Sequence, residues 1–222
     1  MKFVYPEIGK VFDTDIGKIN TLVIENQALL INLLSDIYGQ IEGIDGKSVL
    51  SDNKGILPMS KFAELLTQFV PFELSKKTLI SKISTLLEKK AVAEDMYLET
   101  VELLSSIERY LSKLSFDFNC NPIFQKISIN SLIKASGVEL NEAYDSLGEK
   151  ILDYFELVRE FDHDKLFITF NLRSFLSDSE AQLFIGDILR REINLIMIES
   201  SEHKLLSCEN RLLIDSDLCE IC

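Results

Sequence analysis

Apolar, β-branched runs lie near both ends of this chain, and a long block of helical patterning lies between them. Near the start, residues 21–24 read Thr-Leu-Val-Ile and lead into a helical pattern. Near the end, residues 166–170 and 193–198 are two further runs, separated by one amphipathic segment. Such continuous apolar runs are typical of strands covered on both faces, as in a parallel sheet. A strand–helix–strand unit of this spacing predicts a right-handed crossover.

This order of segments predicts an α/β fold in which both ends of the chain meet. We expect a head with a mostly parallel, nucleotide-fold-like sheet and an inserted, all-helical leg. The expected boundaries are residues 1–72 and 161–222 for the two parts of the head and residues 73–160 for the leg. An inserted leg on such a head favours assembly and macromolecular binding over small-molecule catalysis.

The local patterns divide these regions further. Strands are expected at residues 2–5, 9–13 and 19–25, and a loop or irregular hairpin at residues 43–57. Helices are expected at residues 58–69, from Ser75, at residues 93–114, from Ser128 or Asn130 to Gly137, from Asn141 to about Val158, and from Ser177. The two longest are expected to form a helical hairpin. Glu180, three residues after Ser177, completes a capping box.

The charge balance is strongly acidic, with 36 Asp and Glu against 23 Lys and Arg. Taken alone, this excess disfavours nucleic-acid binding, because affinity for phosphates comes largely from Lys and Arg. No apolar stretch approaches the length of a membrane span and no signal peptide is evident, so a cytoplasmic protein is expected. Reduced thiols are therefore expected, including the terminal pair Cys219 and Cys222, although zinc is conceivable there.

Catalytic motifs are weak throughout. The two histidines are not accompanied by a serine elbow or a paired-histidine metal motif, so an enzyme is not expected. Residues 43–48, Gly-Ile-Asp-Gly-Lys-Ser, resemble a phosphate loop, but Ile41 stands where its first glycine belongs. A helix is also predicted before this segment, where the motif needs a strand. An ATPase with a degenerate loop stays open as a third reading, with loss of nucleotide binding in Lys47→Ala as its test.

Lysines and carboxylates each form loose groups. Lysines occur in and after the glycine-rich segment and along the predicted helix that follows Ser75, and such rows can contact phosphates. They are more often the solvated face of a helix. Carboxylates and amides gather at Asp117 and Asn119 and again at residues 139–145, and calcium prefers such oxygen ligands. Helix capping and dipole complementation explain much of the second group.

Five segments in this order resemble a known family. They are "INTLVIENQALLINLL", "LPMSKFAELLTQFVPFELSKKTLISKISTLLEK", "SINSLIKASGVELNEAYDSLGEKILDYFELV", "KLFITFNLRSFLSDSEAQLFIGDIL" and "INLIMIES". Together they are similar to the CRISPR-associated accessory adaptation protein of type II-A systems. The resemblance covers nearly the whole chain and rests on apolar patterns and element order.

The resemblance implies a non-catalytic protein that needs no nucleotide. Family members form a homotetrameric ring with a lysine-lined hole that binds double-stranded DNA ends without sequence preference. Calcium supports both the ring and the binding, and the protein acts in spacer acquisition with the integrase proteins and the effector nuclease.

The residues carried over from this resemblance form two sets. The DNA-binding set is Lys47, Lys54, Lys61, Lys76, Lys77 and Lys82. The metal-binding set is Asp117, Asn119, Glu139, Glu142 and Asp145. Asn119 departs from a more acidic family pattern, which affects the number of ions that a subunit would hold. The competing interpretation is an acidic scaffold of the adaptation complex that docks basic partners and makes no essential DNA contact.

Overall fold

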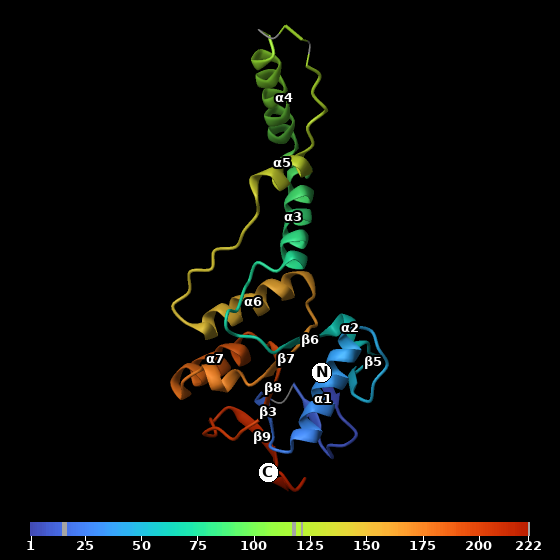
Figure 1. The fold of residues 1–222 in the computed structure, drawn as a ribbon, viewed down its shortest axis with the longest axis vertical. Helices are drawn as coiled ribbons and strands as arrows, with labels where there is room; N and C mark the ends of the chain where they lie inside the picture. The colour runs from blue at the N-terminus through green and yellow to red at the C-terminus, as the bar shows by residue number, and fades with distance from the viewer. Residues whose placement is uncertain (15–16, 117–118, 121, 222) are drawn as a thin grey trace. The chain divides into compact units, whose positions relative to one another are not determined.

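The chain folds into two compact units. The structure, a computed structural model of residues 1–222, describes residues 1–14, 17–116, 119–120 and 122–221. We call residues 1–72 and 143–222 the head unit, and residues 73–142 the leg unit (Figure 1). The leg was expected to end at residue 160, whereas the compact leg unit ends at Glu142.

The described residues of the head unit form two sheets and four α-helices. Its elements are β1 (Lys2–Val4), β2 (Val11–Asp13), β3 (Ile19–Ile24), α1 (Gln27–Ile41), β4 (Val49–Asp52), β5 (Gly55–Leu57), α2 (Met59–Phe62), β6 (Ala63–Leu66), α6 (Leu147–Phe161), β7 (Leu166–Phe170), the 3-10 helix η1 (Leu172–Phe175), α7 (Asp178–Arg190), β8 (Asn194–Glu199), β9 (Glu209–Ile214) and β10 (Glu220–Ile221).

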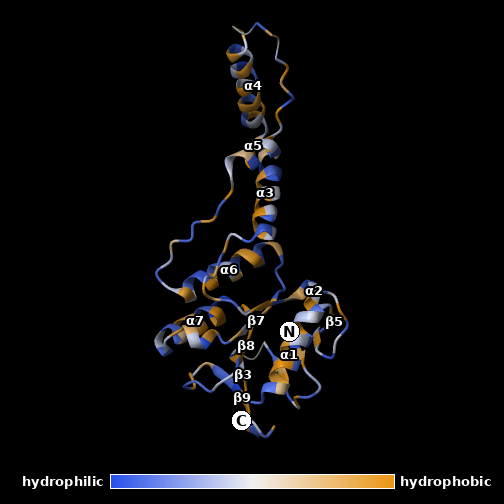
Figure 2. Ribbon diagram, viewed as in Figure 1, coloured by the Kyte–Doolittle hydropathy of each residue, from blue (hydrophilic) through white to orange (hydrophobic). Residues whose placement is uncertain are grey.

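The main sheet confirms the predicted α/β class. In the described residues its strand order is β10-β9-β3-β8-β7-β6, and every neighbouring pair from β9 to β6 is parallel. β3 lies in the middle, and all six of its residues are buried, as expected for a strand covered on both faces. The apolar character of these central strands is visible in Figure 2.

Helices and a second sheet cover the main sheet. On one face, α1 packs Leu33 and Ile37 into a core that also contains residues of β3 and β8 and of the small antiparallel sheet β2-β1-β4-β5. On the other face, Phe155 of α6 stacks on Phe167 of β7, with 3.9 Å between ring centres, and approaches Phe184 of α7. Because these apolar rings lie together, α6 belongs to the head unit.

Residues 58–69 differ from the predicted helix. Only α2, of four residues, is helical, and Ala63–Leu66 form the edge strand β6, which pairs parallel with β7. The spacing of apolar residues suited a helix, but pairing with the distant strand β7 makes residues 63–66 a strand. Tyr154 of α6 donates a hydrogen bond to the Glu64 side chain and links β6 to the helix layer.

Helix starts in the head follow side-chain caps. The predicted capping box at Ser177 and Glu180 is confirmed, because each side-chain oxygen accepts a hydrogen bond from the backbone N–H of the other residue. The prediction that Asn141 caps the next helix was wrong, since α6 begins after Ser146, whose hydroxyl accepts from the Glu149 N–H at 3.2 Å. Serine at this position satisfies an amide that would otherwise lack a partner.

The described part of the leg unit is helical, with α3 (Lys77–Ala91), α4 (Tyr97–Leu114) and α5 (Ile129–Ser136). The predicted start of α5 at Ser128 and its stop at Gly137 are confirmed, and Gly137 has a φ of 67°. The residue before α3 is Lys76, so the predicted cap at Ser75 was one residue early. The packing partner of α3 is α5 rather than α4, so the expected hairpin of the two long helices was wrong.

Candidate functional site

The connection between β3 and α1 occupies the position of a phosphate loop in nucleotide-binding folds. Here it consists of Glu25 and Asn26 alone, and neither is a glycine. The Asn26 side chain accepts from the Leu29 N–H at 3.0 Å and thereby caps α1. A phosphate loop needs a longer glycine-rich turn whose backbone N–H groups converge on the phosphates. This connection cannot provide it.

The cleft beside the start of α1 also disfavours phosphate. It has a volume of about 360 Å³ and lies where β3 and β9 end. Its lining includes Glu7 and Glu220, whose carboxylates would repel a phosphate group. The cleft lies where ligands bind in open α/β sheets, but its negative charge does not suit a nucleoside triphosphate.

The glycine-rich segment after α1 is closed by its own neighbours. The Asp36 carboxylate accepts hydrogen bonds from the backbone N–H groups of Lys47 at 2.6 Å and Ser48 at 2.8 Å. A Cβ added at Gly46 would lie 2.6 Å from both Asp36 and Gln40, so the segment is packed against the helix. Burial raises the pKa of Asp36, but the hydrogen bonds from Ser48, Lys47 and Gln40 outweigh this effect, so the pKa lies below its ordinary value. The amides that a phosphate would need are therefore already bonded to a carboxylate.

The three head lysines of the DNA-binding set are exposed but not equivalent. The Lys47 ammonium lies 2.6 Å from the Glu7 carboxylate, and this hydrogen bond raises the pKa of Lys47. Lys54 lies in the turn between β4 and β5, where its N–H binds Asp52. Lys61 is on α2, with its ammonium 5.1 Å from the centre of the adjacent phenylalanine ring. Lys47 already has an anionic partner, so it is the weakest candidate of the three.

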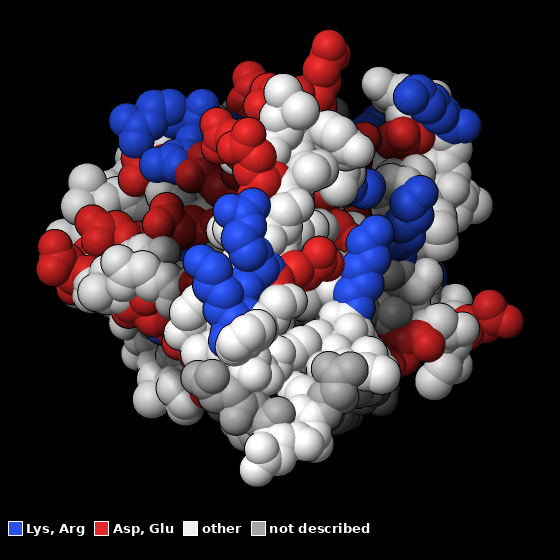
Figure 3. Space-filling model, turned by 90° about the horizontal axis from the view of Figure 1, so that it is seen from above, with Lys and Arg blue, Asp and Glu red and all other residues white. Residues whose placement is uncertain are grey.

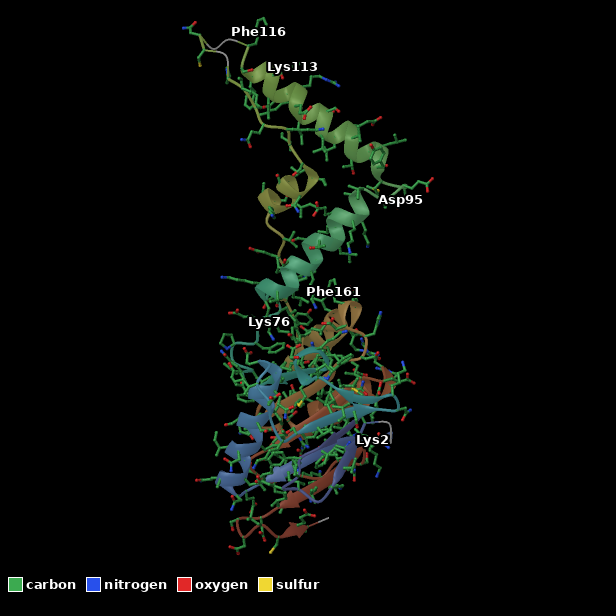
Figure 4. All side chains as sticks on the ribbon, turned by 90° about the vertical axis from the view of Figure 1, so that its right-hand side faces the viewer. Lys2, Lys76, Asp95, Lys113, Phe116 and Phe161 are labelled. Carbon is green, nitrogen blue, oxygen red and sulfur yellow. The ribbon has the colours of Figure 1, made fainter. Side chains whose placement is uncertain are left out.

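The three leg lysines of the set gather at the start of α3. Lys76 is the residue before the helix, Lys77 is its first residue, and Lys82 lies further along, all three exposed. Figure 4 labels Lys76 and Asp95 near the two ends of this helix. The start of a helix carries a partial positive charge, so cations there do not stabilise the helix. They instead strengthen a positive field that would attract an anion.

Charges of both signs are interspersed on the surface. On the described part of the face in Figure 3, blue basic groups and red acidic groups are both present. Basic and acidic side chains are therefore both accessible on this face.

The expected metal ligands are distributed over both units. Asp117 lies outside the described residues, Asn119 and Glu139 are exposed in the leg unit, and Asp145 is exposed in the head unit. The Glu142 carboxylate accepts from two backbone N–H groups just before α3, at 3.2 and 3.1 Å, and so has a structural role. Across the described residues, the side chains form no group of three or more His, Cys, Asp or Glu that could hold a metal ion.

The apolar side of α4 is incompletely covered within the chain. Leu98 is 73% exposed, Val101 42% and Leu114 52%, although the pattern predicts them on one stripe with Leu104, Ile107 and Leu111. Beyond the end of α4, Phe116 is 87% exposed, and Figure 4 labels it near Lys113. Exposed apolar area of this extent commonly marks a protein–protein contact.

A buried charged cluster in the head was not predicted from the sequence. Arg173 of η1 lies between the carboxylates of Glu199 and Glu209, and His203 is close to the first of them. A glutamate that directly follows four apolar strand residues, as Glu199 does at the end of β8, was the signal that could have identified it.

Comparison with known proteins decides the family. A family model described as "CRISPR-associated protein (Cas_Csn2)" matches residues 40–218. The chain belongs to this family. The resemblance stated from the sequence is thereby confirmed, and membership gives the chain a role in CRISPR adaptation.

One solved structure supports the fold independently. The crystal structure of Stu0660 of Streptococcus thermophilus aligns with a TM-score of 0.54 and 17% identity, over 97% of this chain and 75% of that chain. At this identity the likeness shows the fold alone. No curated protein matches the sequence. None of the helices in the described residues is both long and apolar enough to cross a membrane.

Proposed function

We propose that this protein binds the ends of double-stranded DNA without sequence preference and without catalysis, as a calcium-supported homotetrameric ring in spacer acquisition. Its partners in that process are the CRISPR integrase proteins and the effector nuclease. The observation that carries the proposal is family membership, together with a fold position for phosphates that is occupied by Glu25 and Asn26.

The uncovered leg surface supports assembly. The exposed apolar side chains of α4 need a partner, and a second copy of the chain supplies one in a closed ring. A net charge of −13 opposes self-association. Calcium bound by carboxylates at or near subunit contacts would relieve that repulsion. Glu139 and Asp145 are exposed and are the candidate ligands.

The leg lysines support phosphate contact. A ring would repeat the cluster of Lys76, Lys77 and Lys82 in every copy and so create local positive charge in an acidic protein. Contacts of this kind involve phosphates only, so they carry no sequence information and weaken with salt.

The experiment that tests the proposal compares linear with closed circular duplex of the same sequence, with calcium and then with a chelator. We expect binding to the linear form only, and its loss on chelation. Equal binding of both forms would contradict threading onto ends, and binding that is unchanged between low and high salt would contradict phosphate contact.

The Lys77→Gln variant tests the leg lysines. Each lost phosphate contact should reduce the slope of log K against log salt by about 0.9, with weaker binding to every sequence. Lys113→Gln, which removes an exposed lysine in the last turn of a different helix, α4, is the control and should leave the slope unchanged. Equal slopes in both variants and the unaltered protein would remove Lys77 from the interface.

The alternative is a scaffold that acts through protein partners alone. The acidic balance favours it, because the chain has 36 acidic and 23 basic residues. It predicts no salt-dependent DNA binding at any calcium concentration, together with capture of basic protein partners of the adaptation complex at low salt.

A further inference from the structure

Two carboxylates and one guanidinium are buried together in the head unit. Glu199 is fully buried, and Glu209 and Arg173 are 6% and 4% exposed. Arg173 donates from Nη1 to Glu209 Oε1 at 2.8 Å, while its backbone N–H donates to Glu199 Oε1 at 3.1 Å. The guanidinium neutralises Glu209, so ionised Glu199 would leave one unbalanced negative charge in the interior. Such a charge is costly in a medium of low dielectric constant.

The second oxygen of Glu199 faces a histidine. Glu199 Oε2 and His203 Nε2 are 3.7 Å apart, so the two side chains must move closer before a hydrogen bond can join them. Within the described part of the chain, neither atom has a hydrogen-bond partner. One proton placed on Oε2 and directed at Nε2 gives both atoms a partner and removes the unbalanced charge.

The remaining charged groups around the pair do not replace this proton. Asp178, at the start of α7, binds Arg173 Nη2 at 3.1 Å. Glu202 and Arg211 pair with each other at 2.8 Å, so their charges compensate. Lys204 contributes its carbonyl oxygen, which accepts from Arg173. Arg173 is thus shared by Glu209 and Asp178, and Arg211 is paired with Glu202, so neither arginine is left to balance an ionised Glu199.

Residues 200–208 join β8 to β9, and we call them the strap. The strap is held down by the same cluster: Arg173 binds the Lys204 carbonyl, Glu209 accepts from the Leu206 N–H at 3.0 Å, and Arg211 donates to the His203 carbonyl at 3.0 Å. Arg173, Glu209 and Arg211, which lie next to Glu199 and His203, therefore hold the strap in place. A change in the protonation of Glu199 or His203 acts on these same contacts.

We propose that Glu199 and His203 share one proton, with Glu199 as the neutral acid that donates and His203 as the neutral base that accepts, and that this pair is a proton-sensitive latch on the strap. The latch is closed when Glu199 holds its proton. Ionisation of Glu199 leaves a buried, unpaired carboxylate, which favours opening of the strap to water.

The titration of both groups agrees with the latch. Burial raises the pKa of Glu199 to about 7, against the lowering effect of the Arg173 N–H and charge. Burial and the Arg173 charge lower the pKa of His203. Because the closed state holds the Glu199 proton more tightly than the open state, the carboxyl contribution is complete below the ordinary glutamate pKa and is lost as the pH rises to about 7.

Imidazole nitrogen spectra of the full-length protein test the shared proton directly. The chain has two histidines, and exposed His163 provides the internal reference. At neutral pH we expect His203 to be neutral, with Nδ1 protonated and Nε2 accepting. A doubly protonated His203 at pH 7, or a proton on Nε2, would overturn the proposal, and this measurement requires no variant.

Hydrogen exchange of the strap amides tests the latch. Glu199→Gln keeps a donor facing His203 but cannot ionise, and Glu202→Gln is the control on the same segment. The ratio of strap opening constants, unaltered protein over Glu199→Gln, should rise between about pH 5 and 7, by at most about tenfold per pH unit, and then level off. A ratio that is constant with pH, or an equal pH response in the Glu202→Gln comparison, would overturn the proposal.

Discussion

Truncation of Phe155 tests whether α6 is an integral part of the head unit. Phe155 is fully buried, its ring stacks on Phe167 at 3.9 Å with an interplanar angle of 21°, and Phe184 lies at 6.3 Å. Phenylalanine-to-alanine changes in a packed core cost about 3–5 kcal/mol, through lost burial and the cavity that remains. The stacked pair accounts for about 0.5–1.5 kcal/mol of that cost. We therefore expect Phe155→Ala to lower the free energy of unfolding of the head by about 3–5 kcal/mol.

The assay is denaturant unfolding combined with hydrogen exchange of individual amides. Amides of β7 and β8 should lose protection in Phe155→Ala, while amides of α3 and α5 keep theirs, because those helices belong to the leg unit. Glu160→Ala, an exposed change on the same helix, should stay within about 0.5 kcal/mol. A loss below about 1 kcal/mol for Phe155→Ala, or lost protection in α3, would refute the assignment of α6 to the head.

Two further substitutions test contacts described above. Asp36→Ala should expose the N–H groups of Lys47 and Ser48 to exchange and destabilise the head by about 1–3 kcal/mol. Because the pKa of Asp36 is lowered, the stabilisation by its carboxylate is present at neutral pH and is lost on acidification. Unchanged exchange of these two amides at neutral pH would contradict this prediction. Tyr154→Phe should cost about 1.5–3 kcal/mol by removing the donor to Glu64. Burial and the nearby Glu64 charge raise the pKa of Tyr154, so in an alkaline absorbance titration the unaltered protein should contain one more ionisation-resistant tyrosine than the variant.

The strands of the head centre could be predicted from the sequence because their composition leaves few alternatives. Residues 166–170 coincide with β7, and Ser177 with Glu180 specifies the start of α7 through contacts three residues apart. Local rules of this kind require no knowledge of the remaining chain.

Two strands that the sequence did not predict, β6 and β9, have distant partners. Ala63–Leu66 is a strand because β7 lies beside it, and its apolar spacing suits either structure. Glu209–Ile214 was not predicted because its first three residues are polar, and their partners come from distant segments. The candidate lysines could be found by counting, but the pairing of Lys47 with Glu7 joins positions 40 residues apart. Only the fold shows that pairing.

The two-residue connection between β3 and α1 has a consequence for how partner binding can be controlled. This connection cannot cradle a triphosphate, so it provides no nucleotide site from which hydrolysis could time the capture and release of a partner. On the function proposed above, loading and unloading of DNA would follow concentrations alone: those of free ends, subunits, calcium and salt. Release would then come from dilution or from a competitor with higher affinity, as for any reversible clamp that lacks a motor.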